Sequence, residues 1–241
     1  MIKNQKMQLF YISDINESTQ QITFDTMESR HIIRVLRKKE GDCIYITNGR
    51  GLLVTSMIDI ASDKKCQVRV SSCEKKNNSR NYHLHLAIAP TKSNDRLEWF
   101  MEKATEIGID EITPIFTQNS ERRAVKKNRL EKIMIAAMKQ SLKFHLPILN
   151  DPTPLNVFLH LKSNSRRYIA HCREGEKRSM KALIQPSESS TILIGPEGDF
   201  SHEEIVESVN ANFIPISLGK ERLRTETAAL VAVQNIAFIN E

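Results

Sequence analysis

The pattern of apolar residues changes once along this chain, and that change constrains the fold most. Before residue 74, apolar and β-branched residues come in short runs that are typical of strands. These runs are at residues 8–12, 21–24, 42–48, 52–60 and 66–71. After residue 81, similar runs alternate with helical patterns, which is typical of a mostly parallel sheet with helices on both faces. The sequence therefore predicts a small β domain or barrel followed by an α/β domain.

A polar stretch separates the two patterns. Residues 74–81 include turn-forming residues and no apolar residue. We therefore predict a β domain at residues 1–73, a linker at 74–81 and an α/β domain at 82–241. Within the β domain, Asn48-Gly49 lies between two strand-like runs and predicts a hairpin. One short helix is expected at residues 29–36.

In the α/β domain, two pairs of residues have the spacing of a capping box, which opens a helix. They are Asp95 with Glu98 and Ser201 with Glu204, and Gly108 is placed to end the first of these helices. The last helix, residues 226–238, is apolar nearly all round, so we expect it in a core or a subunit interface. Strands are expected at residues 84–89, 109–116, 168–172, 191–194 and 213–218.

Composition excludes several classes of protein. Apolar residues make up 40% of the 241 residues and charged residues 27%, which is ordinary for a folded globular chain. No run approaches the ~20 apolar residues of a membrane span, and no signal peptide is recognisable, so we expect a cytoplasmic protein without a membrane partner. The four cysteines form no C-x-x-C pair, so we expect no metal site.

Positive charge is concentrated in two segments, although the whole chain carries only +6. Residues 121–145 contain eight basic and two acidic residues, and most of them fit the solvated face of one amphipathic helix at residues 126–143. The second cluster comprises Arg30, Arg34, Arg37, Lys38 and Lys39. A solvated surface explains either cluster alone, but two clusters far apart in the sequence favour RNA or DNA as a partner.

The common nucleotide-binding motifs are absent. The eight glycines form neither G-x-G-x-x-G nor a P-loop, so a nucleotide-like cofactor would need another kind of loop. One candidate is Gly195-Pro196-Glu197-Gly198, which directly follows an apolar strand, because ligands bind where parallel strands end. Turns of this composition are common, so this segment alone is weak support for a site.

A second candidate loop follows the next expected strand, at residues 219–228. Thr225 or Thr227 is a possible N-cap of the last helix, and Glu226 suits the positive end of that helix. Helix capping does not explain Arg224. An arginine at this position suits an anion or the edge of a base.

These two loops, together with residues 30–37 and 92–98, resemble the RsmE family of 16S rRNA (uridine-N3) methyltransferases of the SPOUT superfamily. The likeness extends over nearly the whole chain and follows the order of motifs in the family. It implies a PUA-like β-barrel and a SPOUT α/β domain with a deep trefoil knot. It also implies a homodimer that uses S-adenosylmethionine to methylate N3 of a uridine in 16S rRNA, which we expect it to bind within the small ribosomal subunit.

The resemblance also implies which residues bind the cofactor. The first loop and the strand before it contribute Leu193, Ile194, Gly195, Pro196, Glu197 and Gly198. The second contributes Ile216, Ser217, Leu218, Gly219, Leu223, Arg224, Thr225 and Thr227. Cys172 belongs to a third loop, which follows an earlier strand.

Uracil N3 carries a proton and becomes a good nucleophile only when that proton is lost. Arg224 is therefore our candidate for stabilising the uridine anion, and Glu226 for orienting Arg224 or removing the proton. For phosphate contacts we predict a set on the β domain and a set on the α/β domain: Arg30, His31, Arg34 and Arg37; Lys92, Arg122 and Arg123.

Two positions depart from the family pattern. Asp199 stands where a glycine commonly follows Gly-Pro-Glu-Gly, and Lys139 stands where many members have an acid. Two other functions remain open: a non-catalytic RNA-binding factor for ribosome assembly, and a SPOUT methyltransferase with another RNA target.

Overall fold

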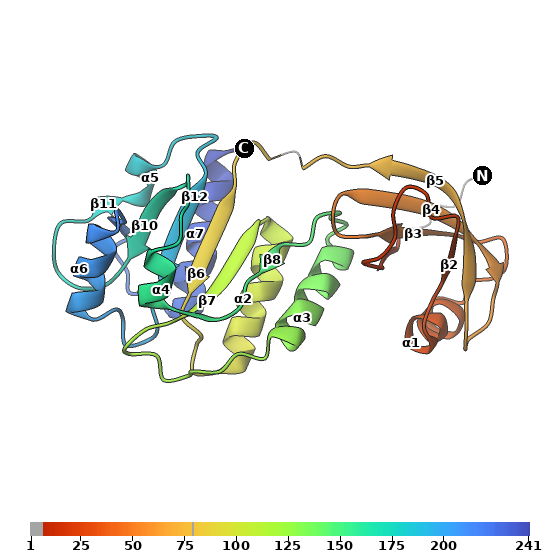
Figure 1. Ribbon diagram of the computed structural model, residues 1–241, viewed down its shortest axis with the longest axis horizontal. Coiled ribbons are helices and arrows are strands. Elements are labelled where there is room, and N and C mark those ends of the chain that lie inside the picture. Colours follow the sequence, from red (N-terminus) through yellow and green to blue (C-terminus); the bar gives the residue numbers. More distant parts are fainter. Residues whose placement is uncertain (1–6, 79) are drawn as a thin grey trace. The chain divides into compact units, whose positions relative to one another are not determined.

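The computed structural model describes residues 7–78 and 80–241, and the chain forms two compact units (Figure 1). The first unit comprises residues up to Ser79 together with Met138–Leu146. The second comprises Arg80–Ala137 and Pro147–Glu241. The first unit is therefore made of two separate segments of the chain, whereas the sequence prediction had one continuous β domain joined to the α/β domain by a single linker. The linker at residues 74–81 stays a prediction, and the last strand of the first unit continues to Lys75.

The first unit is built on a curled five-stranded sheet. Its strands are β1 (Leu9–Tyr11), β2 (Gln21–Thr23), β3 (Cys43–Thr47), β4 (Leu52–Ile60) and β5 (Gln67–Lys75). Their order is β1-β3-β4-β5-β2, with β1 parallel to β3 and the other pairs antiparallel. All five predicted strands are present, and β4 has the predicted bounds.

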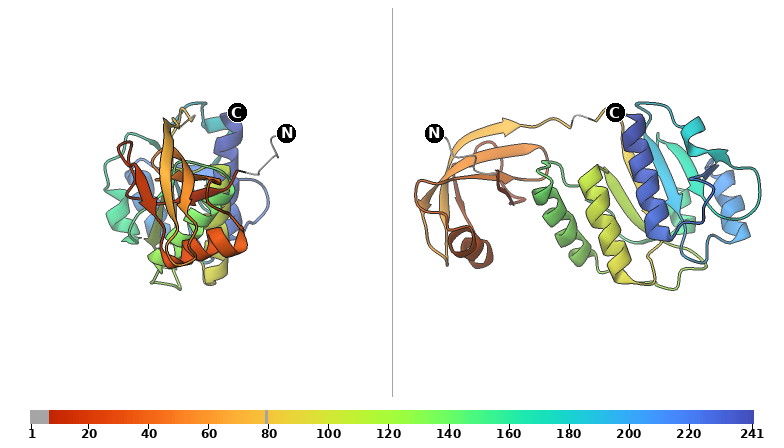
Figure 2. Two further views of the ribbon diagram at one scale, coloured as in Figure 1. Left: turned by 90° about the vertical axis from the view of Figure 1, so that its right-hand side faces the viewer. Right: turned by 180° about the vertical axis from the view of Figure 1, so that it is seen from behind.

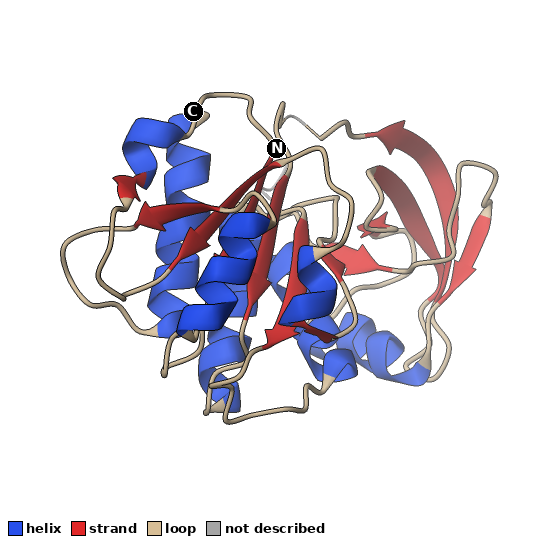
Figure 3. Ribbon diagram, turned by 60° about the vertical axis from the view of Figure 1, so that its left-hand side comes forward, coloured by secondary structure: helices blue, strands red, loops and turns tan. Residues whose placement is uncertain are grey.

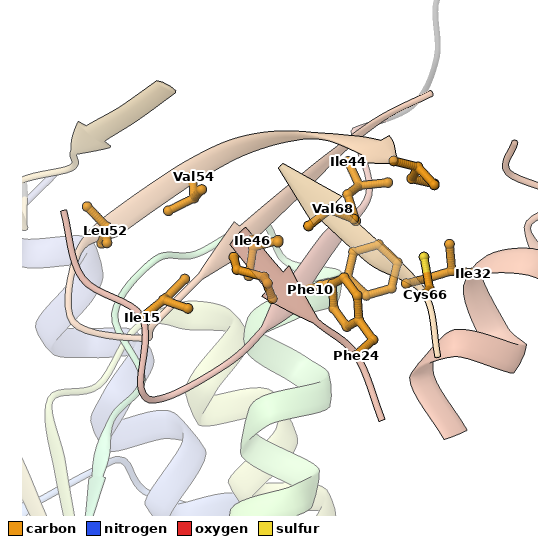
Figure 4. Packing of buried hydrophobic residues seen from close by; sticks show 12 residues of the cluster. Phe10, Ile15, Phe24, Ile32, Ile44, Ile46, Leu52, Val54, Cys66 and Val68 are labelled. Carbon is orange, nitrogen blue, oxygen red and sulfur yellow. The ribbon is translucent and has the colours of Figure 1, made fainter. Parts of the chain in front are cut away.

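Alternating side chains of these strands form the core of the first unit (Figure 4). The rings of Phe10 and Phe24 meet edge to face, with 5.5 Å between their centroids. Helix α1 (Thr26–Arg30) continues into a π-helical turn, η1 (His31–Val35). The helix begins three residues before the predicted start because the carboxylate of Asp25 accepts a hydrogen bond from the backbone N–H of Glu28 (2.8 Å).

The hairpin predicted at Asn48-Gly49 connects β3 to β4. The side-chain oxygen of Asn48 accepts hydrogen bonds from the backbone N–H groups of Arg50 and Leu52. Gly51 has a positive φ of 86°, and a Cβ there would lie 2.7 Å from a backbone carbonyl oxygen. Its N–H donates to the carbonyl of Phe144 (2.8 Å), which places the segment after residue 138 in this unit.

The second unit contains a parallel sheet in the order β11-β13-β10-β12-β6-β7-β8, and β9 also pairs with β7. Its strands are β6 (Leu84–Ile88), β7 (Glu111–Phe116), β8 (Ile148–Leu149), β9 (Thr153–Pro154), β10 (Arg166–Ala170), β11 (Arg178–Ser179), β12 (Ser190–Ile194) and β13 (Ile214–Ser217). Its helices are α2 (Asn94–Ile107), α3 (Lys127–Gln140, whose last three residues belong to the first unit), α4 (Leu155–Leu159), α5 (Met180–Leu183), α6 (His202–Asn210) and α7 (Thr225–Ile239).

Helices cover both faces of this sheet, as predicted (Figures 2 and 3). Ala87, Ile169 and Leu193 point to one face, where they pack in a core with residues of α4 and with Phe200. On the other face, α7 lies beside α2 and against β6 and β12. The buried side of α7 includes Ala229, Ala232, Val233 and Ile236, and its opposite side leaves Phe238 68% exposed. Within the described residues, none of the helices has both the length and the apolar character needed to cross a membrane.

The predicted helix starts have different outcomes. Ser201 and Glu204 form the predicted capping box of α6. The box predicted at Asp95 is wrong: α2 begins after Ser93, and the carboxylate of Glu98 pairs with Arg129 instead. The predicted threonine N-cap of α7 is also wrong. Arg224 occupies that position, and the hydroxyl of Thr225 donates to the carbonyl of Gly195 (3.1 Å).

Candidate active site

Three loops meet at one edge of the parallel sheet. They follow β10, β12 and β13, which are neighbours in the sheet and end at the same edge because all three are parallel. The loops line a pocket of about 580 Å³ and an adjoining one of about 380 Å³. Seven residues line both pockets: Ala170, Cys172, Glu197, Asp199, Arg222, Leu223 and Ala228.

The structure brings most of the predicted cofactor residues to these two pockets. The larger pocket is lined by Gly198, Ile216, Ser217, Leu218 and Gly219, among others, and the smaller by Ile194, Gly195, Pro196, Arg224 and Thr225. Two predicted residues do not line either pocket. Leu193 is fully buried and packs in the core, and Thr227 lies half-buried on α7.

The loop after β12 is folded tightly at its glycines. A Cβ at Gly195 would lie 3.0 Å from the ring of Phe200, and one at Gly198 would lie 3.2 Å from Cβ of Asn119. The side-chain amide of Asn119 donates to the carbonyls of Gly198 (3.1 Å) and Asp199 (2.9 Å). Asn119, in the loop after β7, therefore helps to fix this wall of the pocket, and no sequence motif singled it out.

The backbone conformation and hydrogen bonds of Asp199 explain why aspartate can stand where the family commonly has glycine. Its φ is 59°, in the left-handed region that glycine adopts most easily and that Asp tolerates better than most residues. Its carboxylate accepts hydrogen bonds from the backbone N–H groups of Cys172 (2.8 Å) and Phe200 (2.9 Å). The side chain thus joins the loop after β12 to the loop after β10.

We expect Asp199→Ala to destabilise the second unit by about 1–3 kcal/mol, because it removes both acceptors and keeps a strained backbone. Asp199→Asn keeps one acceptor oxygen and costs less, and Asp199→Gly relieves the backbone while losing the bonds. Urea unfolding of the three variants gives their order of stability. An alanine variant as stable as the parent would show that the carboxylate does not hold the loops together.

A histidine with a lowered pKa lies in the wall of the larger pocket. His171 lines the larger pocket, and burial lowers its pKa, with a further decrease from the nearby Lys177 ammonium. Asp199 acts in the opposite direction and does not cancel this effect. The Nδ1 atom of His171 is buried and makes no hydrogen bond with the described residues.

The two predicted catalytic residues lie at the start of α7. The Arg224 side chain is exposed and lines the smaller pocket. Glu226 is buried with 6% of its surface exposed, at the positive end of the helix, where a carboxylate is favourable. Its Oε1 lies 3.7 Å from Nε of Arg96, and its Oε2 accepts no hydrogen bond from residues 7–78 or 80–241.

Arg96, in the first turn of α2, is a pocket residue that the sequence prediction missed. It lines the smaller pocket together with Arg224. The one sequence signal for it is its place within residues 92–98, one of the segments that resemble the RsmE family.

The RNA contacts predicted on the second unit lie in the loops after β6 and β7. The ammonium of Lys92 pairs with Glu121 (2.9 Å), and its backbone N–H donates to Glu197 (3.0 Å). The guanidinium of Arg122 donates to the carbonyl of Lys92 (2.9 Å) and to the side chain of Asn94. Arg122 is therefore engaged within the protein, whereas Arg123 is exposed and makes one long hydrogen bond, to the carbonyl of Gln118 (3.5 Å).

The contacts predicted on the first unit lie on α1, η1 and the turn that follows. Arg30, Arg34 and Arg37 are exposed. Arg34 pairs with Asp63, and its guanidinium lowers the pKa of that carboxyl. His31 is half-buried, 3.5 Å from Glu28 and stacked at a tilt against the ring of Phe10, which fits a packing role.

Part of the basic helix is neutralised. Three of its basic residues form ion pairs, namely Lys127 with Asp151, Arg129 with Glu98 and Lys139 with Glu28. This fits the solvated face that the sequence left open as an alternative. Lys139, the second departure from the family pattern, therefore has a structural partner within the first unit.

Comparison with known proteins places the whole chain in one family. Residues 77–237 match the family model for an RNA methyltransferase domain, and residues 24–71 match that for an RNA methyltransferase PUA domain. The ribosomal RNA small subunit methyltransferase E of Buchnera aphidicola (subspecies Acyrthosiphon pisum, strain APS) is 32% identical, over 96% of this chain and 93% of its own.

Solved structures agree with these matches. A probable rRNA methyltransferase from Porphyromonas gingivalis is 40% identical, with a TM-score of 0.90 over 97% of this chain and 98% of its own. A putative methyltransferase from Legionella pneumophila, solved in complex with SAM, is 28% identical, with a TM-score of 0.86 over 98% of each chain. The fold class is therefore confirmed as a SPOUT α/β domain with a PUA-like domain, and the trefoil knot stays a prediction. The chain belongs to the ribosomal RNA small subunit methyltransferase E family of RNA methyltransferases.

Proposed function

We propose that this protein transfers a methyl group from S-adenosylmethionine to N3 of a uridine in 16S rRNA. The observation that carries the proposal is the convergence of the three predicted loops on one site at the end of β10, β12 and β13. The relative from Legionella pneumophila, which aligns with nearly the whole chain, was solved in complex with SAM.

The residues of the site fit this cofactor. The pockets have the size of a small-molecule site, and Leu218 and Leu223 supply apolar surface for a nucleoside. Glu197 and Asp199 line both pockets and supply carboxylates, which suit a ligand that carries a sulfonium and an ammonium group. When bound, S-adenosylmethionine supplies an electrophilic methyl group on its sulfur.

Residues of the chain must then prepare the uridine. The carboxylate of Glu226 accepts the N3 proton, and the N3 lone pair forms the new bond to the methyl carbon while the carbon–sulfur bond breaks. Arg224, exposed at the pocket, stabilises the negative charge that spreads onto the uracil oxygens.

The proposal includes the partners of the enzyme. Its substrate is 16S rRNA, bound through exposed arginines of both units within the small ribosomal subunit, and the enzyme works in the cytoplasm. It acts as a homodimer, and α7 and α2, which lie side by side, each expose one large apolar side chain, Phe238 and Trp99.

The decisive experiment maps methyl groups in a strain that lacks the gene. Mass spectrometry of digested rRNA is expected to show that one N3-methyluridine of 16S rRNA is lost, and that the gene restores it. Retention of every N3-methyluridine, with a defect in subunit assembly, would indicate a non-catalytic factor. Loss of a methyl group from tRNA or from a ribose would indicate a different target.

RNA binding has its own prediction. We expect Arg30→Ala to weaken RNA affinity and to lower its salt slope by about one, the value for a single lost phosphate contact. Arg34→Ala has a smaller effect, because Arg34 already pairs with Asp63. The measurement is RNA affinity across a series of salt concentrations.

Arg69 is a matched control for this experiment, since it also pairs with an aspartate, Asp59, and lies on β5 outside the predicted cluster. Arg69→Ala leaves the slope unchanged. Equal slopes for the parent and Arg30→Ala would mean that Arg30 faces solvent in the complex.

A further inference from the structure

Arg96 lies between two carboxylates that belong to different walls of the pocket. Its Nη1 is 3.9 Å from Oε1 of Glu197, in the loop after β12, and its Nε is 3.7 Å from Oε1 of Glu226, in the first turn of α7. The planar guanidinium can pair with two carboxylates at once, whereas the single ammonium of lysine does so less well. Arg96 therefore links the loop after β12 to the start of α7.

Glu226 needs such a partner. Only 8% of its side chain is exposed, and an ionised carboxylate at that depth is unfavourable unless a cation or hydrogen-bond donors compensate it. Its Oε2 accepts no hydrogen bond from the described residues, and the Nε of Arg96 lies close to its Oε1. The geometry leaves one oxygen of the carboxylate beside Arg96 and the other buried with no hydrogen-bond donor among the described residues.

We propose that Arg96 is a positioning residue that orients the carboxylate of Glu226 for its role toward N3 of the bound uridine. The inference rests on the role of Glu226 in the proposed function. Arg96 acts through Glu226, so its loss slows the chemical step more than it weakens binding of either ligand. The contact of Arg96 with Glu197 (3.9 Å) is longer than its contact with Glu226 (3.7 Å), and it supports the same orientation of the Glu226 carboxylate.

The test measures steady-state kinetics on small ribosomal subunits isolated from the deletion strain. Arg96→Met, which keeps the length of the side chain and removes the charge, is expected to lower kcat by about 10- to 100-fold, the cost of a misplaced catalytic group. The KM for S-adenosylmethionine and its Kd by calorimetry stay within about threefold, a shift worth less than 1 kcal/mol. Arg96→Lys restores part of kcat.

A double variant separates positioning from general damage. If Arg96 acts through Glu226, adding Arg96→Met to Glu226→Gln lowers kcat little beyond Glu226→Gln alone. Arg166→Met is the matched control. Arg166 pairs with Glu188 and is 41% exposed, against 38% for Arg96, but it lies at the opposite end of β10 from the pocket. This control keeps the kcat of the parent.

Three results would overturn the proposal: an unchanged kcat in Arg96→Met, fully multiplicative losses in the double variant, or a loss confined to cofactor affinity. A loss confined to cofactor affinity would mean that Arg96 supports the loop after β12 instead. Failure of the proposed function looks different, because the parent enzyme itself would then add no N3-methyluridine to the subunits.

Discussion

Glu226→Gln is expected to lower kcat by about 100- to 10,000-fold, the range that general acid–base catalysis contributes. Glutamine has nearly the shape of glutamate but cannot accept the N3 proton. The carboxylate is buried at the start of α7 and lies beside Arg96. In the sequence, Glu226 directly follows Arg224 and Thr225, which line the smaller pocket. Cofactor affinity is expected to stay near that of the parent, since Glu226 lines neither pocket.

Single-turnover methylation and calorimetry, run on the same preparation, measure the two quantities separately. Glu207→Gln, which changes an exposed carboxylate on α6, is the control for loss of one negative charge. If Glu226 serves only the helix dipole, its replacement costs about 0.3–1 kcal/mol of stability and leaves kcat intact. Normal turnover with lowered stability would therefore assign Glu226 to the helix rather than to the chemistry.

The elements of the fold were predictable where one short segment determines them. The alternation of Leu52, Val54 and Ile58 marks β4, and Asn48-Gly49 marks the hairpin before it, because turn chemistry and strand period are local properties. The Ser201 capping box is local in the same way. These predictions needed no knowledge of what the segments pack against.

Predictions failed where a distant residue decides the outcome. Glu98 has the right spacing to cap a helix at Asp95, but Arg129 of α3 binds it. Thr225 is a good N-cap residue, but its hydroxyl donates to Gly195, which is thirty residues away. Periodicity gives the face of a helix that is buried and not the partner of a polar group on it.

The candidate site shows the same division. The motif around Gly195 and the segment before α7 could be identified from the sequence, and the parallel sheet explains why they meet. Arg96 could not be identified as a site residue, since its role depends on carboxylates 101 and 130 positions away. Likewise, a count of basic residues does not reveal that Arg34 already pairs with Asp63.

Arg224→Ala is expected to lower kcat by about 100- to 1,000-fold, as removal of one charge-stabilising donor does in other enzymes, while cofactor binding persists. Arg224 is exposed at the smaller pocket and is the N-cap residue of α7, a role that its backbone performs. Alanine therefore removes the cation and leaves that backbone geometry available.

The measurement pairs single-turnover methylation with calorimetry, and Lys181→Ala, an exposed change on α5, is the control. Arg224→Lys adds a distinction, because lysine keeps the charge and loses the planar fork. If the cation merely balances the uridine anion, lysine restores most of kcat. If Arg224 must also hold the uracil in place through two directed hydrogen bonds, lysine stays nearly as slow as alanine. A normal kcat in Arg224→Ala would show that Arg224 has no part in the chemistry. Arg96 or Arg222, the other arginines that line the smaller pocket, would then have to stabilise the negative charge on the uridine.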